Sequence, residues 1–178
     1  GGRGAAAGRG AEPAAAPGGG GGGRGGLTQG LDGLPIVKPP YGVLSAINLD
    51  RGDLMWQVPH GETPDNVRNH PALKGLNIPR TGQPGSIGLM VTKTLVVLGD
   101  PQVTSPEGRP RGAMLRAYDK QSGKEVGAVF MPAGQSGSPM TYSVDGRQYI
   151  IVAVSGGNYS GEYIAFALPQ NEVRPSQQ

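Results

Sequence analysis

Most apolar residues occur in nine short stretches, separated by polar segments rich in Gly, Pro, Asp and Asn. Each stretch is rich in β-branched or aromatic side chains, as is typical of a β-strand. We therefore predict strands over residues 43–49, 54–58, 89–92, 95–98, 113–119, 126–131, 139–144, 148–155 and 163–168. The best helical pattern, over residues 63–73, contains Pro64 and Pro71 and allows at most about two turns. The sequence thus predicts an all-β fold.

The connections between these strands alternate in length. Consecutive antiparallel strands reverse direction, so alternate connections lie at opposite ends of the sheets. The short connections are residues 50–52, 93–94, 120–123 and 145–146, and the long ones are 60–88, 99–112, 132–137 and 156–161. We expect the long connections to gather on one face, which on a rigid scaffold is the usual place of a binding or catalytic site.

A short pattern occurs twice, in copies roughly 70 residues apart. It consists of an apolar stretch ending in Ala-x-Asn or Ala-x-Asp, a polar turn with Gly, and a second apolar stretch. The copies are Ala46, Asn48, Gly52 and Trp56, and Ala117, Asp119, Gly123 and Gly127. Such a repeat in an all-β chain indicates a β-propeller. Residues 89–131 supply one complete four-stranded blade, flanked by two strands before it and three after it. We therefore expect the chain to be the C-terminal portion of a longer protein.

Composition divides the chain into segments. Many of its 33 glycines fall in residues 1–33, which hold almost no large apolar side chain and are predicted to be a flexible insertion or linker. Residues 34–169 are the predicted folded part, and residues 170–178 a flexible tail. The net charge of +3 does not indicate nucleic acid as a partner, and the absence of Cys excludes disulfides and thiolate metal sites.

Several motifs together resemble the C-terminal blades of membrane-type quinoprotein glucose dehydrogenases. The motifs are residues 33–42, 56–65, 68–75, 115–119 (Leu-Arg-Ala-Tyr-Asp) and 137–142 (Gly-Ser-Pro-Met-Thr-Tyr). The resemblance implies an eight-bladed propeller that oxidises an aldose or another alcohol with pyrroloquinoline quinone (PQQ) and calcium or another divalent cation. It also implies electron transfer to ubiquinone or a cytochrome, and a periplasmic location. Sequence upstream of this chain could attach such a protein to the inner membrane.

The repeat is similar to this family's tryptophan-docking motif, in which the indole packs between neighbouring blades. Asn or Asp closes the turn through its side chain, Gly accepts a positive φ, and the Trp N–H reaches a backbone acceptor. The second copy departs from the motif because Gly127 stands in the place of Trp.

The resemblance places the catalytic residues and the main cation ligands in earlier blades, so no catalytic or metal-binding residue is assigned here. For cofactor contact, the candidates are Ser86, Ile87 and Gly88, which precede a strand where relatives have a glycine turn near PQQ. Only Gly88 matches that turn, and its alternative role is that of a strand-entry glycine.

Three residues are candidates for substrate contact. Asn158 stands where the glucose dehydrogenases have His; its amide can bind a sugar hydroxyl but cannot transfer a proton near neutral pH. His70 lies in one of the long connections, on the face where these are expected to gather. Tyr41 follows two prolines, which stiffen the backbone that leads to it. The alternatives are a turn residue for Asn158, a loop-packing residue for His70, and a cover over the blade edge for Tyr41.

Two other functions remain open at this point. A non-catalytic propeller could bind a protein or a polysaccharide through the same long-loop face. The Gly-Arg-Gly at residues 8–10 and Arg-Gly-Gly at 24–26 could bind RNA, although they lack interleaved aromatic residues. Phosphate-loop and serine-hydrolase motifs are absent from the sequence.

Overall fold

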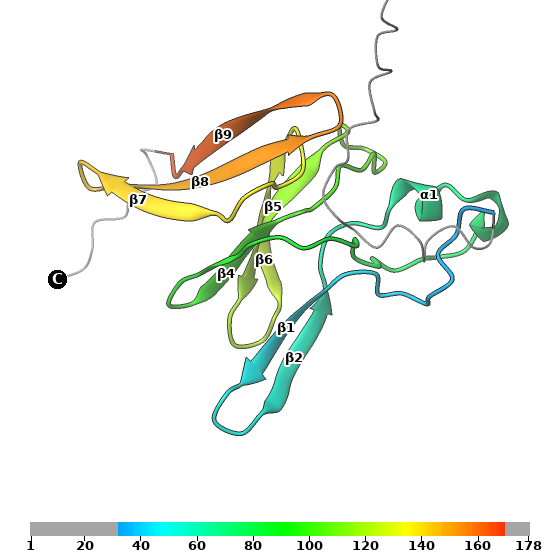
Figure 1. The fold of residues 1–178 in the computed structure, drawn as a ribbon, viewed down its shortest axis with the longest axis horizontal. Coiled ribbons are helices and arrows are strands. Elements are labelled where there is room, and N and C mark those ends of the chain that lie inside the picture. The colour runs from blue at the N-terminus through cyan, green and yellow to red at the C-terminus, as the bar shows by residue number, and fades with distance from the viewer. Residues whose placement is uncertain (1–31, 170–178) are drawn as a thin grey trace, which may run out of the picture.

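A computed structural model describes residues 32–169; the segments predicted to be flexible, 1–33 and 170–178, lie outside this part except for Asp32 and Gly33. The strands are β1 (Val43–Asn48), β2 (Asp53–Pro59), β3 (Met90–Val91), β4 (Leu95–Gly99), β5 (Ala113–Asp119), β6 (Glu125–Met131), β7 (Met140–Val144), β8 (Arg147–Gly156) and β9 (Tyr159–Ala167). They form three antiparallel sheets, β1-β2, β3-β4-β5-β6 and β7-β8-β9 (Figure 1).

The described chain is all-β, as predicted, and each of the nine predicted strands is present. The predicted helical segment contains only one α-helical turn, α1 (Asp65–Arg68), and one 3₁₀ turn, η1 (Pro71–Leu73). Pro71 begins the second turn, where its missing N–H costs no helical hydrogen bond. The grouping into a two-stranded, a four-stranded and a three-stranded sheet also agrees with the sequence prediction.

The prediction of a long connection over residues 156–161 was wrong. β8 and β9 pair up to Gly156 and Tyr159, which leaves only Gly157 and Asn158 as the turn. Gly157 has φ +60, and a glycine with positive φ at the first turn position suits a two-residue hairpin. The glycines that signalled a loop in the sequence therefore form a tight turn and part of two strands.

The four-stranded sheet packs on both of its faces. Side chains alternate along β4, so Val97 faces one neighbouring sheet while Val96 and Leu98 face the other. One core contains Val97, Ala113, Leu115, Met131, Ala133, Val152 and Val154, and thus joins the four-stranded sheet to β8. The second contains Leu44, Val96, Leu98 and Tyr118, with Trp56 and Val58 packed against it, and thus joins the sheet to β1-β2. The three sheets are stacked like successive propeller blades.

Trp56 connects the first two sheets at the short-turn end. Its indole N–H donates to the carbonyl of Lys120 at 3.0 Å, in the turn between β5 and β6. A Cβ built on Gly123 would lie 2.6 Å from the indole ring, so the ring packs directly on this glycine. The Trp of the first repeat copy therefore contacts the turn of the second copy. At Gly127, the corresponding position of the second copy, the space is open among the described residues.

The outer faces of the first and third sheets carry large apolar side chains that are exposed in this part of the chain. They include Ile47, Leu54 and Met55 on the β1-β2 hairpin, and Met140, Val144 and Tyr163 on the third sheet. Exposed apolar faces on both outer sheets are what a stack of blades presents when further blades pack on each side.

We predict that Gly123→Ala destabilises the protein more than Gly52→Ala. Both glycines have positive φ, +71 and +75, so alanine is strained at either position. Only at Gly123 would the new methyl group also meet Trp56, because nothing lies within 4 Å of the equivalent position at Gly52. Thermal or denaturant unfolding of the full-length protein should show an extra loss of roughly 1–3 kcal/mol. Equal losses would contradict the Trp56–Gly123 contact.

Candidate functional site

A buried arginine lies where the long connections meet the four-stranded sheet. Arg116, on β5, is only 2% exposed, and Asp100, directly after β4, is completely buried. The Arg116 Nε donates to Asp100 Oδ1 at 2.6 Å, and Nη2 donates to Asp100 Oδ2 at 3.0 Å. Two parallel hydrogen bonds of this kind fix both side chains in one plane.

The same guanidinium reaches two further carboxylates. Its Nη2 donates to Glu62 Oε1 at 2.9 Å, and its Nη1 contacts Glu125 Oε1 at 3.1 Å. Glu62 lies in the loop after β2, whereas Glu125 begins β6. Arg116 therefore binds three segments that are far apart in the sequence.

Further ion pairs, which lie nearer to solvent, extend this network over the long loops. Arg80 pairs with Glu125 at 2.7 Å and Arg109 with Glu62 at 2.8 Å. Asp65, at the start of α1, accepts from Arg111 at 3.1 Å and from the Ser105 N–H at 2.9 Å. The loops at 60–89 and 100–112 are thus tied to each other as well as to the sheet.

Burial and pairing act against each other on these charges. Burial would lower the pKa of Arg116, but the hydrogen bonds and the charge of Asp100, with Glu125 and Glu62, leave it raised. Burial would likewise raise the pKa of Glu62, but hydrogen bonds from Arg109 and Arg116 leave it lowered. Both groups therefore stay charged at neutral pH.

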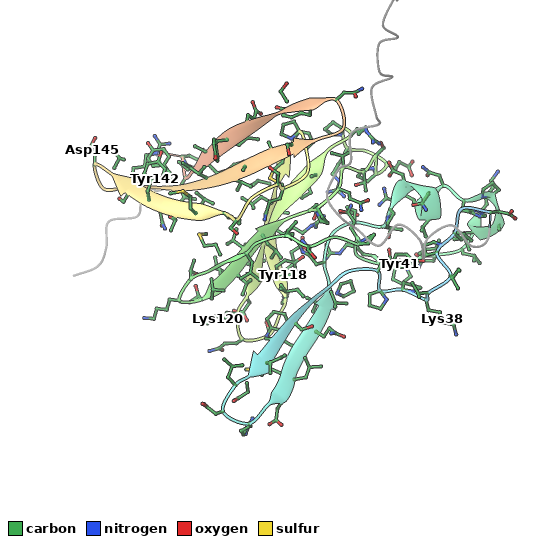
Figure 2. The ribbon with its side chains drawn as sticks, viewed as in Figure 1. Lys38, Tyr41, Tyr118, Lys120, Tyr142 and Asp145 are labelled. Carbon is green, nitrogen blue, oxygen red and sulfur yellow. The ribbon has the colours of Figure 1, made fainter. Side chains whose placement is uncertain are left out.

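His60 connects the loop after β2 to the four-stranded sheet. Its Nε2 lies 2.9 Å from the Gly99 carbonyl oxygen, which can only accept, so this nitrogen carries the proton. Its Nδ1, 2.9 Å from the Tyr118 hydroxyl, is then the acceptor. Burial lowers the pKa of His60 and raises that of Tyr118, so both groups are neutral. Figure 2 shows Tyr118 where the β1-β2 hairpin meets the four-stranded sheet.

The predicted cofactor-contact segment lies directly before β3. Ser86 is exposed, whereas Ile87 packs against the core formed with Leu44 and Tyr118. A Cβ on Gly88 would overlap the Ser138 side chain, and the Gly88 carbonyl accepts from Gln135 Nε2 at 2.6 Å. The glycine is therefore explained by close approach to the segment before β7.

Two of the predicted substrate-contact residues lie in neighbouring loops. Both ring nitrogens of His70 meet backbone groups: Nδ1 accepts from the Ala72 N–H at 3.2 Å, and Nε2 donates to the Asp32 carbonyl at 3.1 Å. Tyr41 donates its backbone N–H to Thr81 at 2.7 Å, and its side chain lines a hollow of about 270 Å³. This hollow is lined by Leu34, Pro35, Ile36, Val37, Lys38, Pro39, Val67, Leu73, Ile78 and Thr81, and is largely apolar. Figure 2 shows Tyr41 and Lys38 on the side of α1.

Asn158, the third candidate, is exposed at the tip of the two-residue β8-β9 turn. Among the described residues, no hydrogen bond joins its side chain to Tyr41 or His70. Its amide is thus presented to solvent, in a position open to a ligand.

PQQ is a planar, anionic o-quinone, so a segment that contacts it needs hydrogen-bond donors and a fixed backbone. Residues 86–88 meet these needs at the edge of such a site, since Ser86 offers an exposed hydroxyl and the packing of Ile87 and Gly88 fixes the backbone. The space beside Gly88 is filled by Ser138, so it does not cradle the ring. Within residues 32–169, no cluster of three or more His, Cys, Asp or Glu could hold a metal ion.

Sequence reasoning missed the buried polar network. A signal was nevertheless present, because Arg116 interrupts the apolar pattern of a strand in Leu-Arg-Ala-Tyr, and Asp100 directly follows the apolar run Leu95–Gly99. Charged residues at such positions are buried only when they are paired.

In the described part of the chain, no helix is long and apolar enough to cross a membrane.

Comparison with known proteins agrees with this architecture. Residues 12–150 match the family described as PQQ: Glucose/ethanol/alcohol dehydrogenase, beta-propeller domain. The chain is 35% identical over 148 residues to a probable quinate dehydrogenase (quinone) of Xanthomonas campestris pv. juglandis, covering 77% of this chain and 17% of the relative. It is 29% identical over 145 residues to quinoprotein glucose dehydrogenase A of Acinetobacter calcoaceticus, covering 79% and 17%.

The family match spans more than half of the chain, so the chain belongs to the PQQ-dependent dehydrogenase β-propeller family. The resemblance to quinoprotein glucose dehydrogenases is thereby confirmed, and relatives named for quinate and glycerol are similar to a comparable degree. The chain spans only 17% of the length of the first curated relatives that it matches.

We predict that Arg116→Met destabilises the full-length protein by about 3–5 kcal/mol, because it leaves the buried Asp100 carboxylate without its partner. The matched control is Arg51→Met, which removes an exposed ion pair with Asp53 and should cost about 0–1 kcal/mol. Adding Asp100→Asn to Arg116→Met should recover part of the loss. Denaturant unfolding measures all three variants, and a cost below that of the control would rule out the buried pair.

We also predict that stability falls as the pH drops below 6.5, the ordinary pKa of His. The pKa of His60 is lowered in the folded protein, so the unfolded chain takes up this proton first and unfolding is favoured. The contribution is complete above pH 6.5 and is lost as the pH falls towards the lower folded value. Between pH 7.5 and 5.5, the melting temperature should fall less steeply with decreasing pH for His60→Gln than for the wild type. Parallel curves would contradict a buried neutral His60.

Proposed function

We propose that the chain is the C-terminal portion of a PQQ-dependent dehydrogenase that oxidises an aldose or another alcohol. The observation that carries this proposal is the match of residues 12–150 to the PQQ dehydrogenase propeller family, together with three stacked antiparallel sheets. Residues 34–169 form one complete blade and parts of two others in an eight-bladed ring. Blades from the rest of the protein cover the exposed apolar faces of the first and third sheets.

In this ring, the Trp56 contact acts as a docking unit between consecutive blades. This role is supported by the packing of the indole on Gly123 and by the bond that its N–H donates to the Lys120 carbonyl. The blade that ends at β6 lacks this unit because Gly127 replaces the Trp. Its packing on the third sheet relies instead on the apolar core and on the backbone bonds of residues 134–136 to β8.

The residues of this chain contribute the rim of the pocket. Ser86 and the backbone of Ile87 and Gly88 hold one edge of PQQ, which supplies a two-electron acceptor for the oxidation of the hydroxyl group. Asn158 and Tyr41 contact the substrate, whereas His70, whose two ring nitrogens are bonded to backbone groups, holds its own loop. Calcium or another divalent cation is bound mainly by residues outside this chain.

The electrons pass to ubiquinone or a cytochrome, in the periplasm and at the inner membrane if the upstream sequence supplies an anchor. The similarity to enzymes named for glucose, quinate and glycerol supports a polyhydroxylated substrate. Such a substrate needs hydrogen-bonding side chains at the rim, and the exposed amide of Asn158 is one.

The test uses the full-length protein, titrated with PQQ and calcium, and follows the reduction of an artificial dye by glucose, quinate and glycerol. We expect saturable turnover that depends on PQQ. A folded protein that does not bind PQQ would overturn the proposal. The alternative, a propeller that only binds a protein or a polysaccharide, would then remain.

Asn158→Ala should raise KM for the substrate roughly fivefold, the cost of one neutral hydrogen bond, with kcat little changed. The control is Gln121→Ala, at the exposed β5-β6 turn on the short-turn end of the sheet. An unchanged KM for Asn158→Ala would assign this residue to the turn alone.

A further inference from the structure

Gln135 is a buried polar side chain to which neither the sequence motifs nor the proposed function gives a role. It lies between β6 and β7 and is only 5% exposed. Its Oε1 accepts the Gly99 N–H, and its Nε2 donates to the Gly88 carbonyl at 2.6 Å. An N–H can only donate and a carbonyl can only accept, so these two partners fix the orientation of the amide.

The backbone at Gln135 is held just as firmly. Its N–H donates to the Asp100 carbonyl at 3.0 Å, and the residue bridges to Val154 on β8. The Asp100 carboxylate is in turn bound by Arg116. A continuous chain of hydrogen bonds therefore runs from the buried ion pairs through Gln135 to Gly88.

This series of hydrogen bonds ends at the segment proposed to contact PQQ. Gly88 has no side chain with which to fix its own position, and Ser86 is exposed. Within the described residues, the Gln135 amide is the side chain that donates a hydrogen bond to the Gly88 carbonyl. Without it, the packing of Ile87 and the approach of Gly88 to Ser138 would remain, but the link from the Gly88 carbonyl through Gln135 to the end of β4 would be lost.

We propose that Gln135 is a positioning residue, which sets the backbone of Ser86–Gly88 for cofactor binding through its bond to the Gly88 carbonyl. The inference rests on the proposed function, since it assigns the consequence to PQQ affinity. It does not make Gln135 a ligand of the cofactor.

Gln135→Glu is the sharpest test because it changes one of the two bonds. The introduced carboxylate can still accept the Gly99 N–H, but it turns an oxygen instead of an N–H towards the Gly88 carbonyl. At lower pH, the protonated carboxyl can donate to that carbonyl again. Gln135→Met has similar length and volume and makes neither bond at any pH. Gln148→Glu is the matched control, because its exposed amide donates to Thr141 in the β7-β8 hairpin.

In the full-length protein at pH 8, we expect Gln135→Glu to raise the Kd for PQQ, measured by fluorescence titration, by about tenfold. Lowering the pH to 6 should bring the ratio of the variant Kd to the wild-type Kd back towards one. It should not do so for Gln135→Met. The charged and titratable groups Asp100, Arg116 and His60 lie in this region, and they act on the variant and the wild type alike. The ratio of the two Kd values removes this shared effect.

Hydrogen exchange of the protein without PQQ gives a second readout. Exchange at residues 86–90 should be faster in both Gln135 variants at pH 8, and unchanged in Gln148→Glu. Faster exchange with unchanged PQQ affinity would overturn the proposal, as would a Kd increase in Gln135→Glu that does not recover at pH 6. If the folded wild type does not bind PQQ, the proposed function fails as well, so the two failures are distinguishable.

Discussion

The pairing of Arg116 with Asp100 is the constraint on which the long-loop end of this structure depends. Neither group could be buried alone, because an unpaired charge in the protein interior costs several kcal/mol. Once they are paired, the same guanidinium also binds Glu62 and Glu125. The loop that follows β2 and the start of β6 are thereby placed relative to β5, so the position of the loops is a consequence of satisfying one buried charge.

This arrangement shows how a propeller can carry long irregular connections without losing a defined surface. The ion pairs of Arg80, Arg109 and Arg111 lie nearer to solvent and add little individually, but they attach the loops to a pair that cannot move without exposing Asp100. His60 adds a neutral link from the same loop to the Gly99 carbonyl. The polar network therefore supplies specificity of position, while the two apolar cores supply most of the stability.

The strands were predictable from the sequence because each has a local signal, namely β-branched residues between turn residues. The connection at 156–161 was not, because glycine is common both in loops and in tight turns with positive φ, as at Gly157. The polar network was harder still, since Arg116 and Glu62 are 54 residues apart and no local pattern connects them. For the candidate site, the sequence pointed to the segment before β3, but it could not show that Ser138 fills the space beside Gly88.

The two contacts of the four-stranded sheet differ in kind, and this difference has a thermodynamic consequence. Towards β1-β2, the contact combines an apolar core with the directional bonds of Trp56 and His60. Towards the third sheet the apolar core is larger, the directional bonds are backbone bonds between residues 134–136 and β8, and Gly127 leaves open space at the margin. The hydrophobic contribution to stability weakens on cooling, whereas hydrogen bonds do not lose strength in this way. Low temperature should therefore loosen the third sheet before the first, which makes this sheet the cold-sensitive boundary of the assembly.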